Sequence, residues 1–212
     1  MSNLTFYTNP MSRGQIVRWA LEEVGAPYDQ HVLGYAGSMK APEYLAINPM
    51  GKVPAIVHDG HVVTECAAIC AYLAEAFPDA GLAPTADERA DYYRWLFFAA
   101  GPVEQAVTNK AMGWEAPTER RATIGYGHFD AVMDTLAQHL TDHDYVCGAR
   151  FTMADVYVGS QILWGLQFGS IPTRPEFEGY AARLNTREAY LRGKDIDNAL
   201  IADAQAAQPA AS

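Results

Sequence analysis

The sequence predicts two domains of different class: an α/β domain at residues 1–78 and an all-helical domain at residues 87–212, joined by a linker at residues 79–86. Up to Phe77, stretches of strand-forming residues are interleaved with stretches whose apolar residues have helical spacing. After Phe77, no stretch is typical of a strand. The segment between the two parts, PDAGLAPTAD, is rich in Pro, Gly and Ala, a composition typical of a linker.

The α/β domain is expected to contain a four-stranded mixed sheet covered by helices. The expected strands are residues 4–8, 28–33, 54–58 and 61–64, and the expected helices are residues 12–24 and 65–77, with one helical turn in PEYLAI. Gly25 and Pro27 end the first helix, and Asp59-Gly60 is a strong signal for a two-residue hairpin turn. A strand-helix-strand crossover gives a parallel pair, to which the hairpin adds antiparallel strands.

The rest of the chain is expected to be helical. The expected helices are residues 87–112, 118–140, 151–168 and 175–191, the last stretch forming one or two helices. The first of them is expected to bend at Gly101-Pro102, because proline cannot donate a hydrogen bond inside a helix. The third is apolar nearly all round, which indicates a buried helix. The tail from Asp203, rich in Ala and Gln, is expected to fray.

Composition excludes several classes of function. With 15 basic and 25 acidic residues the formal net charge is −10, which argues against nucleic acid and against an anionic membrane surface as partners. Residues 1–8 lack the basic start and long apolar stretch of a signal peptide, and no run reaches the roughly 20 apolar residues of a membrane span. Three cysteines, with no C-x-x-C motif, indicate a reduced, cytoplasmic compartment.

Three stretches together resemble the cytosolic glutathione transferases, in particular the bacterial members. They are NPMGKVPAI with TECAAICAYL, NPMSRGQIVRWALEE, and FTMADVYVG. The resemblance covers nearly the whole chain. It implies a thioredoxin-like, glutathione-binding domain followed by an all-α domain with an electrophile pocket. It also implies glutathione as co-substrate, no metal, and a homodimer.

The resemblance implies that the Val53-Pro54 bond is cis and that Val53 presents its backbone N–H and C=O to glutathione. An extended peptide can pair with such a backbone like an added strand, and the cysteinyl residue of glutathione is the paired unit in this family. Lys52 is a candidate partner for the glycine carboxylate, or else a solvated loop lysine. Asn48 and Gly51 are expected to shape the loop rather than contact ligand.

Glu65 and Cys66 stand at the expected start of a helix, where backbone N–H groups without partners attract anions. By resemblance, the N–H of Cys66 binds the α-carboxylate of the γ-glutamyl end, and Glu65 pairs with its ammonium group. The family usually has Ser at this position, and a thiol is a weaker donor than a hydroxyl. Alternatively, Glu65 is an ordinary acid in the first turn, favoured there by the helix dipole, and Cys66 is a small core residue. We interpret Cys70 as a core residue.

Three residues in FYTNPMSRG are candidates to stabilise the glutathione thiolate, the nucleophilic form of the thiol. Ser12, at the expected helix start, is the first choice, because by resemblance it occupies the position at which bacterial cysteine-type members have Cys. Asn9, near the position used by serine-type classes, is the second, and Tyr7, at the position used by tyrosine-type classes, is the third. Ser12 would otherwise be a helix N-cap, and Tyr7 a packed strand residue. Arg13 either orients this loop or lies on the surface.

Aromatic and apolar residues are expected to form the electrophile pocket, although each could equally pack in the core. The candidates are Met11, Phe98, Trp114, Tyr126, Trp164 and Phe168. The expected reaction is the conjugation of glutathione thiolate to a small hydrophobic electrophile. The alternatives are a glutathione-dependent disulfide reductase or isomerase of the same fold, and a non-catalytic glutathione-binding protein.

Two further motifs are interpreted as structural. Thr152 and Asp155 in TMAD form a capping box, with Asp in place of the usual Glu. His139 and His143 have a spacing that can hold a metal ion, but the flanking acidic residues are also typical of a helix end, and no metal is expected.

Overall fold

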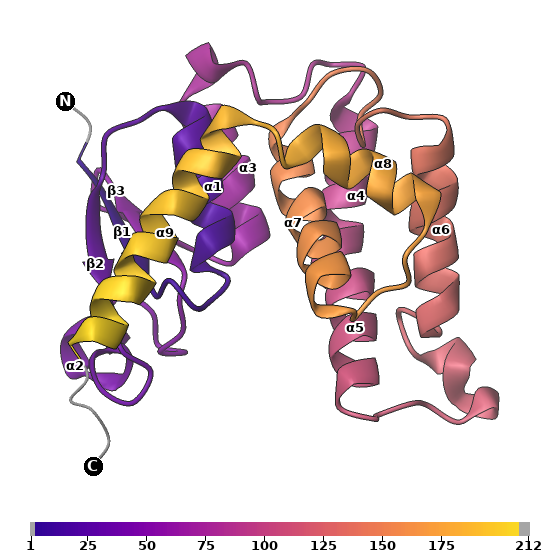
Figure 1. Cartoon of the computed structure of the whole chain (residues 1–212), viewed down its shortest axis with the longest axis horizontal. Helices are drawn as coiled ribbons and strands as arrows, with labels where there is room; N and C mark the ends of the chain where they lie inside the picture. The colour runs from indigo at the N-terminus through magenta and orange to yellow at the C-terminus, as the bar shows by residue number, and fades with distance from the viewer. Residues whose placement is uncertain (1–2, 208–212) are drawn as a thin grey trace. The chain divides into compact units, whose positions relative to one another are not determined.

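A computed structural model describes residues 3–207, which divide into two compact units (Figure 1). The first unit combines residues 1–81 with residues 187–212, and the second contains residues 82–186. This grouping differs from the expected helical domain at residues 87–212, because the C-terminal helix belongs with the first unit. None of the described helices has the length and apolar character needed to cross a membrane.

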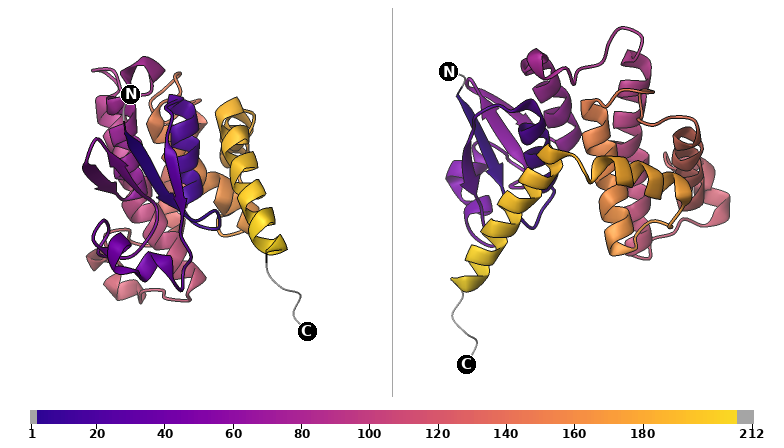
Figure 2. Two further views of the ribbon diagram at one scale, coloured as in Figure 1. Left: turned by 90° about the vertical axis from the view of Figure 1, so that its left-hand side faces the viewer. Right: turned by 45° about the horizontal axis from the view of Figure 1, so that its top comes forward.

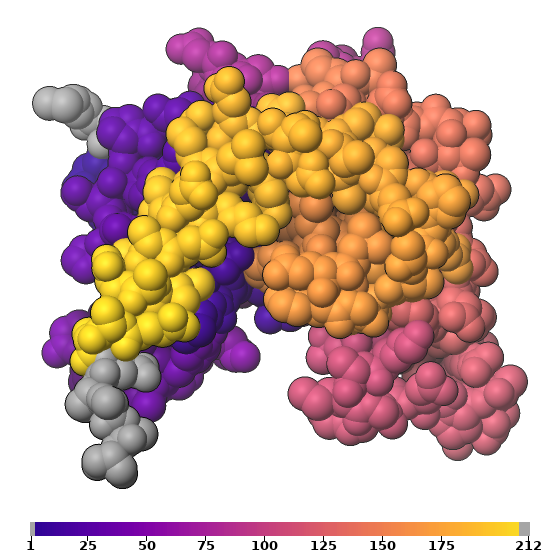
Figure 3. Space-filling view, in the orientation of Figure 1, coloured from indigo at the N-terminus to yellow at the C-terminus, as the bar shows by residue number. Residues whose placement is uncertain are grey.

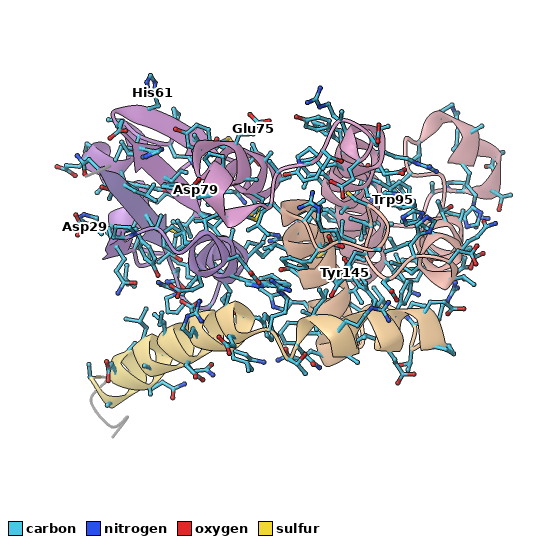
Figure 4. All side chains as sticks on the ribbon, turned by 90° about the horizontal axis from the view of Figure 1, so that it is seen from above. Asp29, His61, Glu75, Asp79, Trp95 and Tyr145 are labelled. Carbon is cyan, nitrogen blue, oxygen red and sulfur yellow. The ribbon has the colours of Figure 1, made fainter. Side chains whose placement is uncertain are left out.

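The first unit is built around the expected mixed sheet of four strands. Its elements are β1 (Leu4–Thr8), α1 (Gly14–Val24), β2 (Asp29–Val32), α2 (Pro42–Leu45), β3 (Ala55–His58), β4 (His61–Thr64), α3 (Cys66–Ala76) and α9 (Glu188–Ala206). The strand order is β2-β1-β3-β4, with β1 and β2 parallel and the other pairs antiparallel. The labelled side chains of Asp29 and His61 point outward from the two edge strands (Figure 4).

The two faces of the sheet are covered differently. Strand alternation places the buried Leu4 and Phe6 on the face that α1 covers, where the Arg18 guanidinium carbon lies 5.2 Å from the Phe6 ring centroid. On the opposite face, Met39, Tyr44 and Ala55 form a small buried cluster, against which Tyr7 and Val53 pack. The loop that leads into β3 is therefore anchored by side chains beneath the sheet.

Helix α9 packs along α1 (Figure 2), and in the space-filling view its atoms lie over those of the N-terminal segments (Figure 3). The Trp19 and Tyr190 rings meet edge to face at 5.0 Å, and Arg187 forms two hydrogen bonds with Glu23. These contacts explain why the C-terminal helix groups with the first unit. The helix continues to Ala206, so the expected fraying from Asp203 is wrong as far as the described residues extend; residues 208–212 lie outside them.

An ion pair between Arg18 and Asp197 lies in the buried interface of α1 and α9. Arg18 Nε donates to Asp197 Oδ1 at 2.9 Å, and both side chains are at most 2% exposed. Asp197 Oδ2 has no hydrogen-bond partner among the described residues. Burial raises the pKa of Asp197 to about 6, against the opposing effect of the Arg18 guanidinium.

The raised pKa of Asp197 gives a pH-dependent contribution to stability. Because the folded protein holds this proton up to about pH 6 and the unfolded chain only to about pH 3.9, the contribution is present at low pH and lost as the pH rises through about 6. We expect the free energy of unfolding of the wild type, minus that of Asp197→Asn, to be larger at about pH 4.5 than at about pH 7.5. The change in this difference between the two pH values is at most about 3 kcal/mol, because the folded and unfolded pKa values differ by about two units and each unit is worth about 1.36 kcal/mol. Urea unfolding at both pH values measures the difference, and a change of opposite sign would contradict the prediction.

The described secondary structure of the second unit is helical apart from an isolated β-bridge between Tyr145 and Gly148. Its elements are α4 (Arg89–Phe98), α5 (Glu104–Ala111), α6 (Phe129–Thr141), α7 (Met153–Phe168) and α8 (Pro175–Leu184). A π-helical segment, Ala99–Val103, joins α4 to α5 at the expected bend and contains Pro102. The labelled Trp95 of α4 is buried within this unit (Figure 4).

One expected helix of the second unit is wrong in its extent. Instead of a helix at residues 118–140, there is a short 3-10 helix, Thr118–Thr123, a break, and then α6 from Phe129. Gly127 has a φ of 69°, a left-handed conformation that interrupts a right-handed helix. The extended His128 follows as the N-cap of α6, and its side chain accepts the Ala131 N–H.

Candidate active site

The loop before β3 is fixed by side chains of α2 and of the loop itself. The backbone C=O of Lys52 accepts hydrogen bonds from the Tyr44 hydroxyl at 2.5 Å and from Asn48 Nδ2 at 2.8 Å. Burial raises the pKa of Tyr44, which keeps this donor protonated. Gly51 has a φ of 57°, and its C=O accepts from Lys40 Nζ at 2.8 Å. The expected shaping role of Asn48 and Gly51 is confirmed, whereas Tyr44 was missed.

This anchoring leaves the backbone of Val53 open. The Val53-Pro54 peptide bond is cis, in agreement with the expectation. Neither the N–H nor the C=O of Val53 has a hydrogen-bond partner among residues 3–207. Polar backbone groups beside a sheet that lack an internal partner are available to an extended peptide.

Glu65 and the start of α3 lie opposite this loop. In the β3-β4 pairing Ala55 faces Thr64, so continuing the register places Pro54 opposite Glu65. Glu65 has a φ of 66°, which is uncommon for a residue other than glycine. A non-glycine residue held in this conformation is a reason to consider a functional role. The adjacent α3 spans Cys66–Ala76 and presents its first N–H groups at the same end of the sheet.

The cysteines of α3 have different surroundings. Cys66 is buried, and its Sγ lies 3.7 Å from the backbone O of Arg13, which brings the start of α3 beside the start of α1. Cys70 is fully buried, and burial raises its pKa well above the usual value for a thiol. The interpretation of Cys70 as a core residue is confirmed.

The turn at residues 9–14 places Ser12 at the N-terminal end of α1. Its Oγ donates to the Asn9 backbone O at 2.6 Å and accepts the Gly14 N–H at 2.9 Å. The Asn9 amide holds the same turn, because Nδ2 donates to the Leu33 backbone O and Oδ1 accepts the Met11 N–H. Ser12 is half-buried and Asn9 is buried. Both side chains therefore have structural roles, and the second Nδ2–H of Asn9 has no hydrogen-bond partner among residues 3–207.

Tyr7 is placed differently from the other two candidates. Its ring lies 5.1 Å from that of His31 and 5.4 Å from that of Tyr44, on the face of the sheet away from α1. Ser12 follows on the side of α1. The structure thus brings Ser12 and Asn9 together in one turn, whereas Tyr7 packs in the cluster under the sheet. The side chains of Lys52 and Glu65 are exposed.

The expected electrophile-pocket residues are distributed over both units. Met11 belongs to the first unit and is 64% exposed. In the second unit, Trp114 and Tyr126 line one cavity, and Phe98 packs edge to face on Trp95 at 5.2 Å. Trp164 is half-buried and Phe168 is 72% exposed.

The remaining motifs have structural partners. Thr152 and Asp155 form the expected capping box of α7. His139 Nε2 bonds to the Val146 backbone O, His143 Nδ1 bonds to the His139 backbone O, and the two rings stack at 4.2 Å. Among the described residues, no group of three or more His, Cys, Asp or Glu side chains is arranged to hold a metal ion.

The geometry defines a class: a unit with a four-stranded mixed sheet, a cis-proline loop with an open backbone and an adjacent helix start, together with a helical unit. Family models agree. Residues 11–76 match the N-terminal domain of the glutathione S-transferases, and residues 104–164 match their C-terminal domain. The chain belongs to the glutathione S-transferase family.

Relatives and solved structures give the same result. A glutathione S-transferase of Xanthomonas campestris is 29% identical over 178 residues, covering 78% of this chain and 84% of the relative. A glutathione transferase homologue of Sulfitobacter with bound glutathione is 27% identical, with a TM-score of 0.73 and coverage of 92% of this chain and 98% of that one. A sphingomonad glutathione S-transferase complexed with glutathione is 26% identical, with a TM-score of 0.74 and the same coverage.

Proposed function

We propose that this protein is a glutathione transferase that conjugates glutathione to small hydrophobic electrophiles. The glutathione sulfur attacks an electrophilic carbon, a C–S bond forms, and the leaving group departs with the bonding electron pair. The main supporting observation is the backbone of Val53, which has no hydrogen-bond partner among the described residues and directly precedes Pro54, the residue opposite Glu65 at the start of α3. Relatives that bind glutathione support the identity of the peptide.

Each end of glutathione has a proposed partner. Its cysteinyl backbone pairs with the N–H and C=O of Val53, as an added strand does. The α-carboxylate of the γ-glutamyl end accepts from the N–H of Cys66 at the start of α3, where the helix dipole favours an anion. The Glu65 carboxylate pairs with the α-ammonium group, and Lys52 with the glycine carboxylate. The sulfur then points toward the turn at residues 9–14, which meets the start of α3 through Arg13 and Cys66.

Ser12 is the proposed sulfur donor. A hydroxyl hydrogen rotates about the Cβ–Oγ bond to suit its acceptor, so Ser12 can turn its hydrogen from the Asn9 carbonyl to the thiolate. During this rotation the Oγ keeps the Gly14 N–H as a donor, which holds the oxygen in place. The resulting charge-assisted hydrogen bond lowers the pKa of the bound thiol.

We expect Ser12→Ala to lower kcat/KM for a generic aryl halide by about 10²-fold, because one donor is removed from a preorganised site. The pKa of bound glutathione, measured from the absorbance of the thiolate as a function of pH, should rise in the same variant. Tyr7→Phe is the matched control and should leave both quantities unchanged, because its ring packs on the other face of the sheet. Unchanged activity in Ser12→Ala would transfer the donor role to Asn9.

One observation favours a second candidate reaction. The Asn9 amide retains an N–H without an assigned bond beside Ser12, and an amide donor at sulfur would suit a glutathione-dependent disulfide reductase or isomerase. Activity with hydroxyethyl disulfide but not with an aryl halide would favour this reaction. Retention on immobilised glutathione with neither activity would favour a non-catalytic binding protein.

The electrophile is proposed to contact apolar side chains, and the candidates are Met11, Phe98, Trp114, Tyr126, Trp164 and Phe168. Of these, Met11, Trp114 and Phe168 are exposed. In this proposal residues 1–78 bind glutathione, and the helical part within residues 87–212 binds the electrophile. Residues 79–86 are the linker.

The cellular setting is also a proposal. Cys66, Cys70 and Cys147 are all free thiols, which supports a reducing, cytoplasmic compartment. A homodimer and a role in detoxification are proposed from family membership. Size-exclusion chromatography with light scattering tests the oligomeric state.

A further inference from the structure

The helical unit contains a cavity of its own, formed within residues 106–130 where α5, the following loop and the start of α6 meet. Its volume is about 160 Å³. The side chains that define its chemistry are Lys110, Trp114, Arg121, Tyr126, His128 and Phe129. No residue of the first unit contributes to it, so the cavity is complete within the second unit.

A hydrogen bond holds the Tyr126 side of this cavity in place. Asn109 Nδ2 donates to the Tyr126 hydroxyl at 3.1 Å, and the backbone N–H of Trp114 donates to the backbone O of Asn109 at 2.8 Å. The Trp114 side chain itself is 65% exposed. A Tyr126 side chain that is held before the ligand arrives reduces the ordering cost of binding.

Three side chains that can donate hydrogen bonds line this cavity: Arg121, His128 and Lys110. The Arg121 side chain is half-buried, and no ion pair or hydrogen bond joins its guanidinium to any residue in 3–207. The His128 Nδ1 accepts the Ala131 N–H at 3.3 Å, which assigns the ring hydrogen to Nε2 and makes Nε2 a donor. Lys110 Nζ lies 3.6 Å from the Phe129 ring centroid, a cation–π contact that fixes a positive charge at the wall.

The cavity also has two carboxylates, Glu115 and Asp130. Both residues are exposed, as is Lys110, whereas Arg121 and His128 are half-buried. Water screens exposed charges strongly, so the two carboxylates affect a ligand inside the cavity less than the half-buried donors do. The interior is therefore selective for an anion despite the balanced formal charge.

We propose that this cavity binds a small aromatic carboxylate. The ligand ring stacks against Trp114 and Tyr126, and its carboxylate accepts from the Arg121 guanidinium, the group best suited to bidentate recognition, and from His128 Nε2. The volume is below the roughly 300–1,000 Å³ typical of sites for larger ligands, which limits the ligand to one ring with a short substituent. The site works without glutathione. Trp114 and Tyr126 are also proposed electrophile contacts, whereas Arg121 and His128 have no role in the proposed transferase reaction.

The test is an NMR titration of the full chain, without glutathione, with three probes of equal size: benzoate, benzamide and benzylammonium. Benzoate should shift the Trp114 indole and Gly127 amide resonances to saturation, and it should bind at least tenfold more tightly than the other two probes. Arg121→Gln should weaken benzoate binding at least tenfold. Arg120→Gln is the matched control, because Arg120 is adjacent and exposed but does not line the cavity.

Equal affinity for benzoate and benzamide would overturn the proposal, as would shifts that remain linear up to about 50 mM, far above the ~1 mM scale of weak binding. So would equal affinities of Arg121→Gln and the wild type. Transferase activity does not enter the readout, so this test can fail while the proposed function stands, and the reverse also holds.

Discussion

Replacing Asp155 by alanine is expected to lower the free energy of unfolding of the helical unit by about 4 kcal/mol. The Asp155 carboxylate is fully buried and accepts four hydrogen bonds. Oδ1 accepts from the Val146 N–H and the Tyr180 hydroxyl, each at 2.8 Å. Oδ2 accepts from the Thr152 N–H at 2.8 Å and the Thr152 hydroxyl at 3.0 Å. The substitution leaves these donors buried without an acceptor, and each such loss costs about 1–3 kcal/mol.

The protonation state of Asp155 makes its asparagine variant informative. Burial raises the pKa of Asp155, and of its four partners only the Thr152 and Tyr180 hydroxyls can accept a proton, because the Val146 and Thr152 backbone N–H groups only donate. In either orientation an asparagine amide nitrogen would face one of these two backbone N–H groups. We therefore expect Asp155→Asn to be nearly as destabilising as Asp155→Ala.

Urea unfolding followed by circular dichroism measures both variants. Asp142→Ala is the control, because Asp142 is exposed and lies at the end of α6 in the same unit. Its effect should stay within about 0.5 kcal/mol, as for most surface substitutions. A loss below about 1 kcal/mol in Asp155→Ala would show that the box contributes no more than an ordinary helix cap.

The sequence predicted those elements that local signals specify. The mixed sheet follows from alternating strands, a crossover and the Asp59-Gly60 turn, and the start of α7 follows from the capping box in TMAD. The break before α6 was missed, because residues 118–140 were expected to form one helix although Gly125 and Gly127 lie within this range. Two glycines close together, Gly125 and Gly127, followed by the polar His128, were the sequence signal for a break in the helix.

The candidate site was predictable to a smaller extent. Pro54, Glu65 and the 9–14 turn were named as site residues mainly through the resemblance to the glutathione transferases, and their roles stay predictions. The sequence could not give the direction of the Ser12 hydroxyl, which depends on a carbonyl three residues away. Nor could it reveal that Tyr44 supports Lys52, because that bond depends on how α2 packs beneath the sheet.

The membership of the C-terminal helix was beyond local prediction altogether. Arg18 and Asp197 are 179 positions apart, and no short-range pattern connects them. One signal did exist in the stretch IVRWAL, where a charged residue is flanked on both sides by apolar residues. Since arginine is almost never fully buried without a partner, Arg18 indicated that an acidic residue lay elsewhere in the chain.

The second large effect is expected at this pair: Arg18→Met should lower the free energy of unfolding by about 3–5 kcal/mol. Arg18 is fully buried and donates to three acceptors. They are Asp197 Oδ1 at 2.9 Å, the Tyr28 hydroxyl at 2.8 Å and Gln30 Oε1 at 2.9 Å. Methionine fills similar volume but leaves the Asp197 carboxylate without a countercharge. The cost arises mainly from leaving this buried carboxyl without a partner, so that it must remain charged or take up a proton, rather than from lost attraction.

A double-mutant cycle separates these two contributions. If the stranded carboxylate causes the loss, Arg18→Met with Asp197→Leu should be at least about 2 kcal/mol more stable than the sum of the single losses predicts, since an apolar pair can replace a buried ion pair. Additive losses would contradict this account. Arg192→Met is the matched control, because Arg192 also pairs from α9 to α1, at 3.3 Å from Glu22, but is 53% exposed. An exposed pair contributes about 0–1 kcal/mol, so the control separates burial from mere pairing between the same two helices.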